Sequence, residues 1–336
     1  MLIRIVDIGS NSVKASLYAV ERGAHRLVAR NKLDYSPGNA VFPRGRIPDS
    51  GLAKIAAFVR DAGGRSGARP HFTFVLATSA VRSAQNRDTF VKRLAAETGV
   101  EVRVLSGAEE SFLIHTGILA GAGGKLKGVT KTIDIGGGSA EVSWSRDGRY
   151  LFGRSYELGA IRLARAFADG KPYTREGLQR IHDFALEQFR ARSPAAAPPA
   201  DRAIGSSGNV RAIGRMLRRV RSRVFSARVP EVTPGALEDI AEISAGLTPA
   251  GVASFFDLPP DRARIILPAV MVLLASLRHF GIARLGIVEA GLREGAAAYW
   301  SRHGHLNLPE LEEHEPQAQV ADAKSRPKVR KARKPR

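Results

Sequence analysis

The sequence contains nearly the same turn twice, and this repeat limits the folds that the chain can adopt. Asp7-Ile8-Gly9-Ser10-Asn11-Ser12 follows one apolar run, and Asp134-Ile135-Gly136-Gly137-Gly138-Ser139 follows another, 127 positions later. In both copies a carboxylate ends the apolar run, a glycine-containing turn follows, and an alternating apolar segment leads away. Each copy therefore predicts a strand, a tight turn and a second strand. We expect a duplicated fold in which both turns face one anionic ligand.

The order of the other predicted elements indicates an α/β protein. Paired strands open each half of the chain, and strands then alternate with helices, which predicts two similar lobes. Residues 1–123 are the first expected lobe and residues 124–306 the second. Residues 36–51 are rich in Gly and Pro and predict a loop. Residues 307–336 turn acidic and then basic with little apolar content, so we expect them to be disordered.

Composition excludes several classes of site. The chain of 336 residues has no cysteine, which excludes disulfides, zinc-thiolate sites and thiol nucleophiles. The N-terminus lacks the layout of a signal peptide, and the longest apolar run, residues 265–277, is too short to span a bilayer. We read that run as a buried core helix. We therefore expect a cytoplasmic protein with no transmembrane segment.

The charge of the chain predicts a polyanionic partner. The formal net charge is +20, and residues 320–336 alone hold eight Lys or Arg and one acid. The remainder is therefore basic in its own right. Nucleic acid such as RNA, polyphosphate, a phosphorylated nucleotide and an anionic membrane all fit this charge, and composition does not choose among them. Whether the protein forms a homodimer is equally open.

Three turns are candidate phosphate sites. Successive backbone N–H groups in a small, glycine-containing turn point into one concavity and bind phosphate oxygens, and a helix N-terminus does the same. The third turn, Gly205-Ser206-Ser207-Gly208-Asn209, opens a predicted helix. The candidate phosphate-binding residues are Gly9, Ser10, Asn11, Ser12, Gly136, Gly137, Gly138, Ser139, Ser207, Gly208 and Asn209.

The carboxylates beside the first two turns are candidate metal ligands. An Asp at a strand end repels phosphate, but it can bind a hard divalent cation that bridges to the phosphate. Asp134 occupies this position in the second copy and Asp7 in the first. Glu141 lies on the strand that returns from the second turn, so its side chain could reach the same ion. We expect Mg²⁺ or Mn²⁺.

Two further segments carry candidate catalytic groups. Arg82 follows a predicted strand, where its guanidinium could fork onto phosphoryl oxygens; without the turns it would be read as a surface ion pair. Glu109 and Glu110 begin a predicted helix. Acids are favoured there by the helix dipole, and either one could act as a general base that orients water. Residue types alone do not decide between the two.

An arginine-rich helix is predicted after the third turn. Residues 211–228 contain seven arginines and no acid, whereas a solvated helix face normally mixes charges of both signs. Apolar residues at helical spacing can pack inward while most arginines face outward. We interpret Arg211, Arg215, Arg218 and Arg219 as a track for an extended polyanion.

Taken together, these segments resemble the exopolyphosphatase and guanosine pentaphosphate phosphatase family of the sugar-kinase and actin-like superfamily. The resemblance covers about residues 1–300 in family order. The matching stretches are residues 7–13, 77–82, 105–110, 134–141, 157–160, 205–209 and 291–295.

The resemblance implies two ribonuclease-H-like lobes with an active-site cleft between them, and magnesium-dependent hydrolysis of a terminal phosphoanhydride. It implies that Glu110, rather than Glu109, activates the water. It also implies that Asp134 and Glu141 hold the metal, with Asp7 as a contributor, and that Arg82 contacts the terminal phosphoryl group.

The sequence departs from the family pattern in three places. Ser111-Phe112 stand where Ala-Arg is usual, Asn209 stands where Thr is usual, and Glu289-Ala290 replace a common Asp-Gly. Three functions remain in view: an exopolyphosphatase, a guanosine pentaphosphate phosphatase, and a protein with weakened catalysis that binds polyphosphate or nucleic acid.

Overall fold

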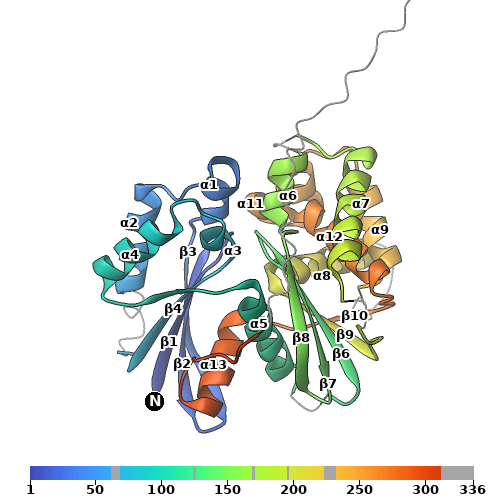
Figure 1. The fold of residues 1–336 in the computed structure, drawn as a ribbon. Coiled ribbons are helices and arrows are strands. Elements are labelled where there is room, and N and C mark those ends of the chain that lie inside the picture. Colours follow the sequence, from blue (N-terminus) through green and yellow to red (C-terminus); the bar gives the residue numbers. More distant parts are fainter. Residues whose placement is uncertain (62–68, 124–125, 169–170, 195–196, 223–231, 312–336) are drawn as a thin grey trace, which may run out of the picture.

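Two mixed sheets form the centres of two lobes in the computed structural model (Figure 1). The structure describes residues 1–61, 69–123, 126–168, 171–194, 197–222 and 232–311. Within them each sheet has five strands, ordered β3-β2-β1-β4-β5 in the first lobe and β8-β7-β6-β9-β10 in the second. In each lobe the first three strands pair antiparallel and the last two add in parallel. The predicted duplication and the two-lobed α/β fold are confirmed.

The elements of the first lobe are β1 (Leu2–Ile8), β2 (Val13–Glu21), β3 (Ala24–Leu33), α1 (Pro37–Arg44), α2 (Asp49–Asp61), β4 (Phe72–Ala77), α3 (Ser79–Arg82), α4 (Arg87–Thr98), β5 (Val102–Val104) and α5 (Gly107–Gly121). Those that follow are β6 (Val129–Ile135), β7 (Ala140–Arg146), β8 (Arg149–Tyr156), α6 (Ala160–Phe167), α7 (Arg175–Arg192), β9 (Arg202–Ser206), α8 (Ser207–Ser222), α9 (Pro234–Ser244), α10 (Pro249–Phe256), α11 (Pro260–Ala263), α12 (Ile266–His279), β10 (Leu285–Ile287) and α13 (Leu292–His303).

The sheet topology places the repeated turns at equivalent positions. One turn joins β1 to β2 and the other joins β6 to β7, at the ends where the parallel strands β4 and β9 also finish. Ligands of open α/β sheets bind outside these carboxyl ends. The register also sets neighbours, because Asp7 lies opposite Lys14 and Asp134 lies opposite Glu141.

The core of the second lobe is built around α12. Every residue from Ile266 to Leu277 is buried, as the apolar run predicted. The helix packs against α7 and α9, and Phe280 just beyond it packs edge-on against Trp144 of β7. A helix that is apolar all round needs such an enclosed position.

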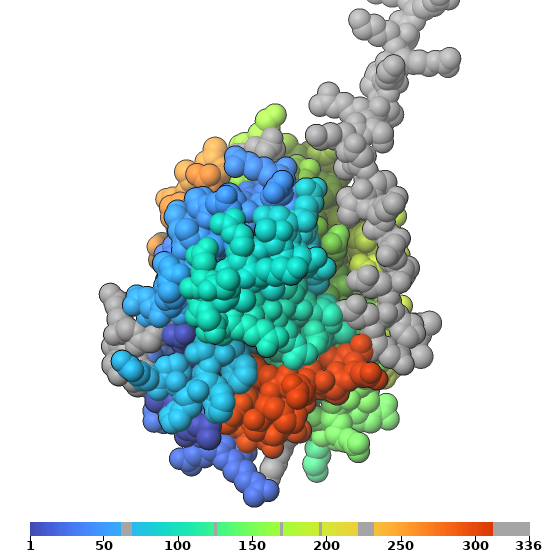
Figure 2. Space-filling view, turned by 60° about the vertical axis from the view of Figure 1, so that its left-hand side comes forward, coloured from blue at the N-terminus to red at the C-terminus, as the bar shows by residue number. Residues whose placement is uncertain are grey.

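Helix α13 packs beneath the first lobe, although the sequence placed it with the second. Its strongest packing is against α5, and it also contacts β1 and β3. Leu292, Ala296 and Tyr299 share one buried cluster with Ile3 and Leu105. Figure 2 shows α13, in orange-red, directly below the teal segments of the first lobe. The two helices α5 and α13 therefore form the base that joins the lobes.

The predicted loop at residues 36–51 is wrong, because it contains α1 and the start of α2. Proline at the first helical position, here Pro37, costs α1 no hydrogen bond. The N–H of Gly38 donates to the carbonyl of Ser10 at 2.8 Å, which fixes α1 beside the first turn. Of the segment predicted to be disordered, residues 307–311 have no helix or strand, and residues 312–336 lie outside the described residues. Within the described part, no helix has the length and apolar character needed to cross a membrane.

Polar side chains join α5 to the second sheet. His115 Nδ1 lies 2.8 Å from Thr132 Oγ1, and the hydroxyls of Ser111 and Ser143 lie 2.7 Å apart. All four residues are buried. Because a buried polar group is costly when it loses its partner, these pairs fix how α5 sits on the second lobe.

His115 predicts a pH-dependent stability. Burial lowers the pKa of His115 to about 3, so between that pH and about 6.5 the unfolded chain binds the extra proton and stability falls as pH falls. Between pH 7 and pH 5 the free energy of unfolding, measured with urea, should fall by about 2 kcal/mol less in His115→Gln than in the wild type. Other titrating groups are common to both proteins and cancel. The matched variant His303→Gln, at an exposed position, should keep the pH dependence of the wild type. Equal losses of stability in the wild type and both variants would contradict the role of His115.

Candidate active site

The three predicted phosphate turns meet in one cleft between the lobes. Its walls include every residue predicted for phosphate binding, together with Asp7, Asp134 and Glu110. The structure thus brings together residues from β1, β6, β9 and α5 that lie far apart in the sequence. The other lining residues are Lys14, Arg30, Thr78, Ser79, Ile114, Ile135, Ser206, Arg211, Arg262, Glu289, Ala290, Gly291, Leu292, Arg293 and Glu294.

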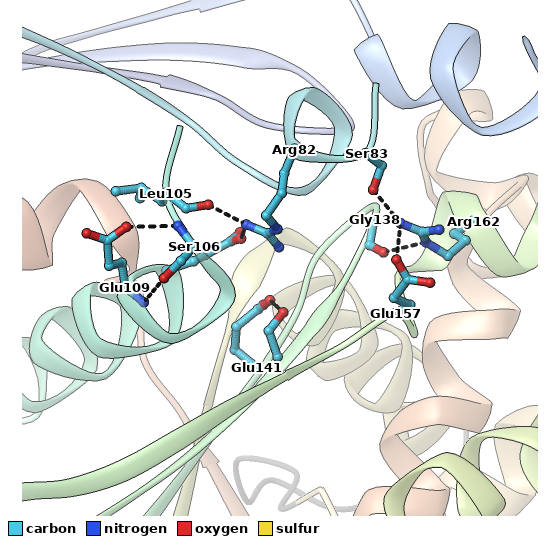
Figure 3. Close-up of polar contacts among 11 residues, drawn as sticks. Arg82, Ser83, Leu105, Ser106, Glu109, Gly138, Glu141, Glu157 and Arg162 are labelled. Atoms are coloured by element: carbon cyan, nitrogen blue, oxygen red, sulfur yellow. Dashed lines mark hydrogen bonds and ion pairs between the residues drawn. The ribbon is translucent and has the colours of Figure 1, made fainter. Parts of the chain in front are cut away.

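The first two turns pack directly against each other. A Cβ added to Gly138 would lie 2.5 Å from the hydroxyl oxygens of both Ser10 and Ser79. A Cβ on Gly159 would lie 2.2 Å from the backbone of Gly138. A side chain at Gly159 would overlap backbone, so glycine is required there, and a side chain at Gly138 would displace both hydroxyls. Arg162 of α6 also joins the two lobes here, by donating to the Gly138 carbonyl and to Ser83 Oγ of the other lobe (Figure 3).

The third turn is tied to the second by Asn209. Its amide Nδ2 donates to the carbonyls of Ile135 and Gly136, at 2.8 and 3.1 Å, and its Oδ1 accepts from Arg262. The side chain therefore positions the turn, while the predicted phosphate contact of Asn209 stays a prediction. Ser207 begins α8 with a φ of 90°. Strained backbone of this kind is concentrated at binding sites.

Glu110, rather than Glu109, faces the cleft. Its carboxylate is buried, and Oε2 accepts a hydrogen bond of 2.8 Å from Arg82 Nη1. Burial raises the pKa of Glu110, while the Arg82 charge opposes that rise. Glu109 turns away: it pairs with Arg103 and closes a capping box with Ser106 (Figure 3). Of the two glutamates only Glu110 lines the cleft, and its role as general base stays a prediction.

Arg82 holds Glu110 in place. The same Nη1 that reaches the carboxylate also donates to the Leu105 carbonyl at 2.8 Å (Figure 3). Arg82 is not among the residues that line the cleft. Its predicted contact with a phosphoryl group stays a prediction, and its visible role is to orient the Glu110 carboxylate.

The carboxyl groups predicted to hold the metal have raised pKa values, and Asp134 and Glu141 are buried. Burial raises the pKa of Asp134 to about 7, with the Glu110 charge adding to the rise. The pKa of Glu141 is raised well above its usual value by burial and by Glu110 and Asp134, and that of Asp7 is raised by burial. Acids crowded in this way favour a cation among them.

A magnesium ion fits the donors that face the cleft. No ready-made cage of three or more His, Cys, Asp or Glu side chains occurs among the described residues. Mg²⁺ does not need one, because it is commonly held by one or two carboxylates together with substrate phosphates and water. Asp7 and Asp134 line the cleft and can serve in this way. Glu141 does not line it (Figure 3). It lies opposite Asp134 across β6 and β7, and its Oε1 accepts from Ser155 at 2.8 Å.

The sequence reasoning missed several cations in the cleft. Lys14, Arg30, Arg262 and Arg293 line it beside the predicted Arg211. The position of Lys14 could have been predicted from the sequence, because a tight hairpin places Lys14 opposite Asp7. Arg293 lies in a stretch already quoted for the resemblance. Nothing local marks Arg262, since it reaches the cleft from α11 and donates to Asn209 of α8.

The matched family agrees with this geometry. The model of the Ppx/GppA phosphatase family matches residues 66–302. The chain belongs to the Ppx/GppA phosphatase family. Exopolyphosphatase 1 of Mycobacterium tuberculosis is 28% identical over 301 residues, covering 88% of this chain and 87% of that protein. The protein of the same name from Mycobacterium leprae is 28% identical over 302 residues, covering 88% of each.

Solved structures share the fold of this Ppx/GppA chain. An exopolyphosphatase from Cytophaga hutchinsonii superposes with a TM-score of 0.76 at 19% identity, covering 90% of this chain and 98% of that one. The Aquifex aeolicus member of the Ppx/GppA family superposes with a TM-score of 0.72 at 21% identity, covering 89% of this chain and 97% of that one. These neighbours confirm the two-lobed actin-like fold. Family membership also makes the chain a phosphatase, and therefore a hydrolase.

Proposed function

We propose that the protein is an exopolyphosphatase, which releases orthophosphate from the end of inorganic polyphosphate. The observation that carries this proposal is the position of Glu110. It is a buried carboxylate held by Arg82 at the start of α5, in a cleft lined by the three turns that the sequence predicts to bind phosphate. The names of the mycobacterial relatives support the same substrate.

In the proposed reaction Glu110 accepts the proton of a water molecule that attacks the terminal phosphorus in line. A bond forms between the water oxygen and phosphorus, and the bond from phosphorus to the bridging oxygen breaks. Backbone N–H groups of the turns and the lining cations bind the oxygens of the transferring group. Asp7 and Asp134 would hold Mg²⁺, which when bound neutralises charge on the phosphoryl oxygens.

The lining of the cleft favours polyphosphate over a guanosine nucleotide. Five cations line it, whereas none of its described lining residues is aromatic. Protein sites commonly hold a nucleobase by stacking it on an aromatic ring. A chain of phosphates needs only cations and N–H donors, which this cleft supplies.

Orthophosphate release from polyphosphate and from guanosine pentaphosphate, measured side by side with Mg²⁺, tests the proposal. We expect the larger kcat/KM on polyphosphate and loss of both activities when a chelator removes the metal. A larger kcat/KM on guanosine pentaphosphate would reverse the substrate assignment. Binding of polyphosphate without any phosphate release would instead indicate a binding protein.

A further inference from the structure

A row of arginines leads away from the cleft along α8. Arg211, Arg215 and the pair Arg218 and Arg219 occupy successive turns of the helix, about 6 Å apart along its axis. The opposite face of α8 is apolar and buried, with Ile213, Met216 and Leu217 in the core. Packing therefore fixes which way the helix faces and leaves Arg215, Arg218 and Arg219 exposed.

The row begins inside the cleft and continues beyond it. Arg211 lines the cleft, and Arg262 of α11 lines it as well. Arg215, Arg218 and Arg219 line a separate, shallow groove together with Phe256 and Asp257 at the end of α10. The first turn of α8 is the third phosphate turn, so a phosphate chain that leaves this turn meets the arginines in order.

The cluster at the start of the row carries unbalanced positive charge. The pKa of Arg262 is lowered by its burial and by the charges of Arg215 and Arg211. Among the described residues none of these three arginines forms an ion pair with an acid, and the hydrogen bond of Arg262 goes to the neutral amide oxygen of Asn209. Like charges held together without a counter-ion favour an anion between them.

We propose that Arg211, Arg215 and Arg262 form a second phosphate subsite, and that the groove at Arg218 extends it for longer chains. We call these four arginines the α8 subsite. It rests on the proposed function, because it binds the part of a polyphosphate chain whose end is hydrolysed in the cleft. The internal phosphates of the chain carry no nucleobase, so the charge and hydrogen bonds of guanidinium groups suffice to bind them. The α8 subsite makes the enzyme prefer chains that are long enough to reach it.

The test compares long-chain polyphosphate with tripolyphosphate in the double variant Arg215→Gln, Arg218→Gln. We expect KM for the long chain to rise about tenfold through the loss of two charge-assisted contacts, with kcat unchanged. The KM for tripolyphosphate should change less than twofold. The salt dependence of the long-chain KM should also become shallower, since fewer counterions are exchanged.

A matched control removes the same charge from another helix of the same lobe. Arg180 and Arg190 are exposed on α7 and line neither pocket. The variant Arg180→Gln, Arg190→Gln should keep the wild-type KM on both substrates. Equal effects of the two double variants, or equal effects of the α8 variant on both chain lengths, would overturn the subsite.

Three further outcomes show which ligand uses the α8 subsite and whether the subsite or the proposed function itself fails. If the α8 variant raises KM for guanosine pentaphosphate and not for long polyphosphate, the subsite belongs to a nucleotide and the polyphosphate assignment is overturned. If the wild type releases phosphate but the α8 variant keeps the wild-type KM for long-chain polyphosphate, the α8 subsite alone is overturned. Absence of wild-type release would overturn the proposed function.

Discussion

Glu110→Gln should lower kcat for phosphate release from polyphosphate by about a thousandfold, which is within the range that a positioned general base contributes. The amide keeps the shape of the carboxylate but cannot accept the proton of the attacking water. The loss belongs to the chemical step, so the dissociation constant for polyphosphate should stay near that of the wild type. Initial rates and equilibrium binding of the same preparation separate these two effects.

Glu109→Gln is the matched control for this change. The two glutamates are adjacent in sequence, but Glu109 pairs with Arg103 and caps α5, and it does not line the cleft. Gln also serves at this position of a capping box, so helix α5 should remain intact. We expect Glu109→Gln to keep kcat within about threefold of the wild type, because it touches no reacting group. Similar rates for the two variants would remove Glu110 from its assigned role.

Gly295→Ala should destabilise the protein by at least about 3 kcal/mol, at the upper end of overpacking effects. A Cβ at this position would lie 1.7 Å from the carbonyl oxygen of Leu113 and 2.9 Å from the backbone nitrogen of Gly117. Both belong to the backbone of α5, so a rotamer change cannot relieve the overlap. Helix α13 must then move away from α5, and Glu110 at the start of α5 moves with that packing. Urea unfolding and kcat of the folded fraction report the two consequences.

Gly235→Ala provides the comparison for backbone effects. Gly235 lies in the first turn of α9, and nothing lies within 4 Å of the position that its Cβ would take. Because alanine has the higher helix propensity, we expect stability to be unchanged or raised by up to about 1 kcal/mol. If Gly295→Ala were tolerated as well as Gly235→Ala, the close packing of α5 on α13 would be contradicted.

The repeated turns explain why much of the fold was predictable from sequence. A tight turn after a strand has a local signal, and two copies imply two lobes whose turns face one cleft. The buried helix α12 was likewise visible as an apolar run. The predicted loop at residues 36–51 was wrong because Pro and Gly were read as breakers. Pro37 instead opens α1, and Gly38 allows a close approach to the first turn.

The parts of the site that depend on tertiary packing were not predictable in the same way. The choice between Glu109 and Glu110 is made by the direction of α5, which α13 and the second sheet hold in place. Arg262 reaches the cleft from α11, which is distant in sequence from the turns, and no local pattern marks it. The side-chain amide of Asn209 joins two turns, a role that the sequence did not predict beside its expected phosphate contact. Such roles follow from which backbone groups lie nearby, and sequence spacing does not encode them.

The most direct test of the central claim is to follow polyphosphate hydrolysis with Mg²⁺ by phosphorus NMR, which separates orthophosphate, chain ends and chain interiors. Attack on the terminal phosphorus predicts that orthophosphate accumulates from the first time point while the signal of chain interiors falls. The signal of chain ends should stay constant until the chains are nearly consumed. A rise in chain ends without orthophosphate would show internal cleavage, and an unchanged spectrum would show no hydrolysis. Either result would contradict the assignment of this cleft to the removal of terminal phosphate.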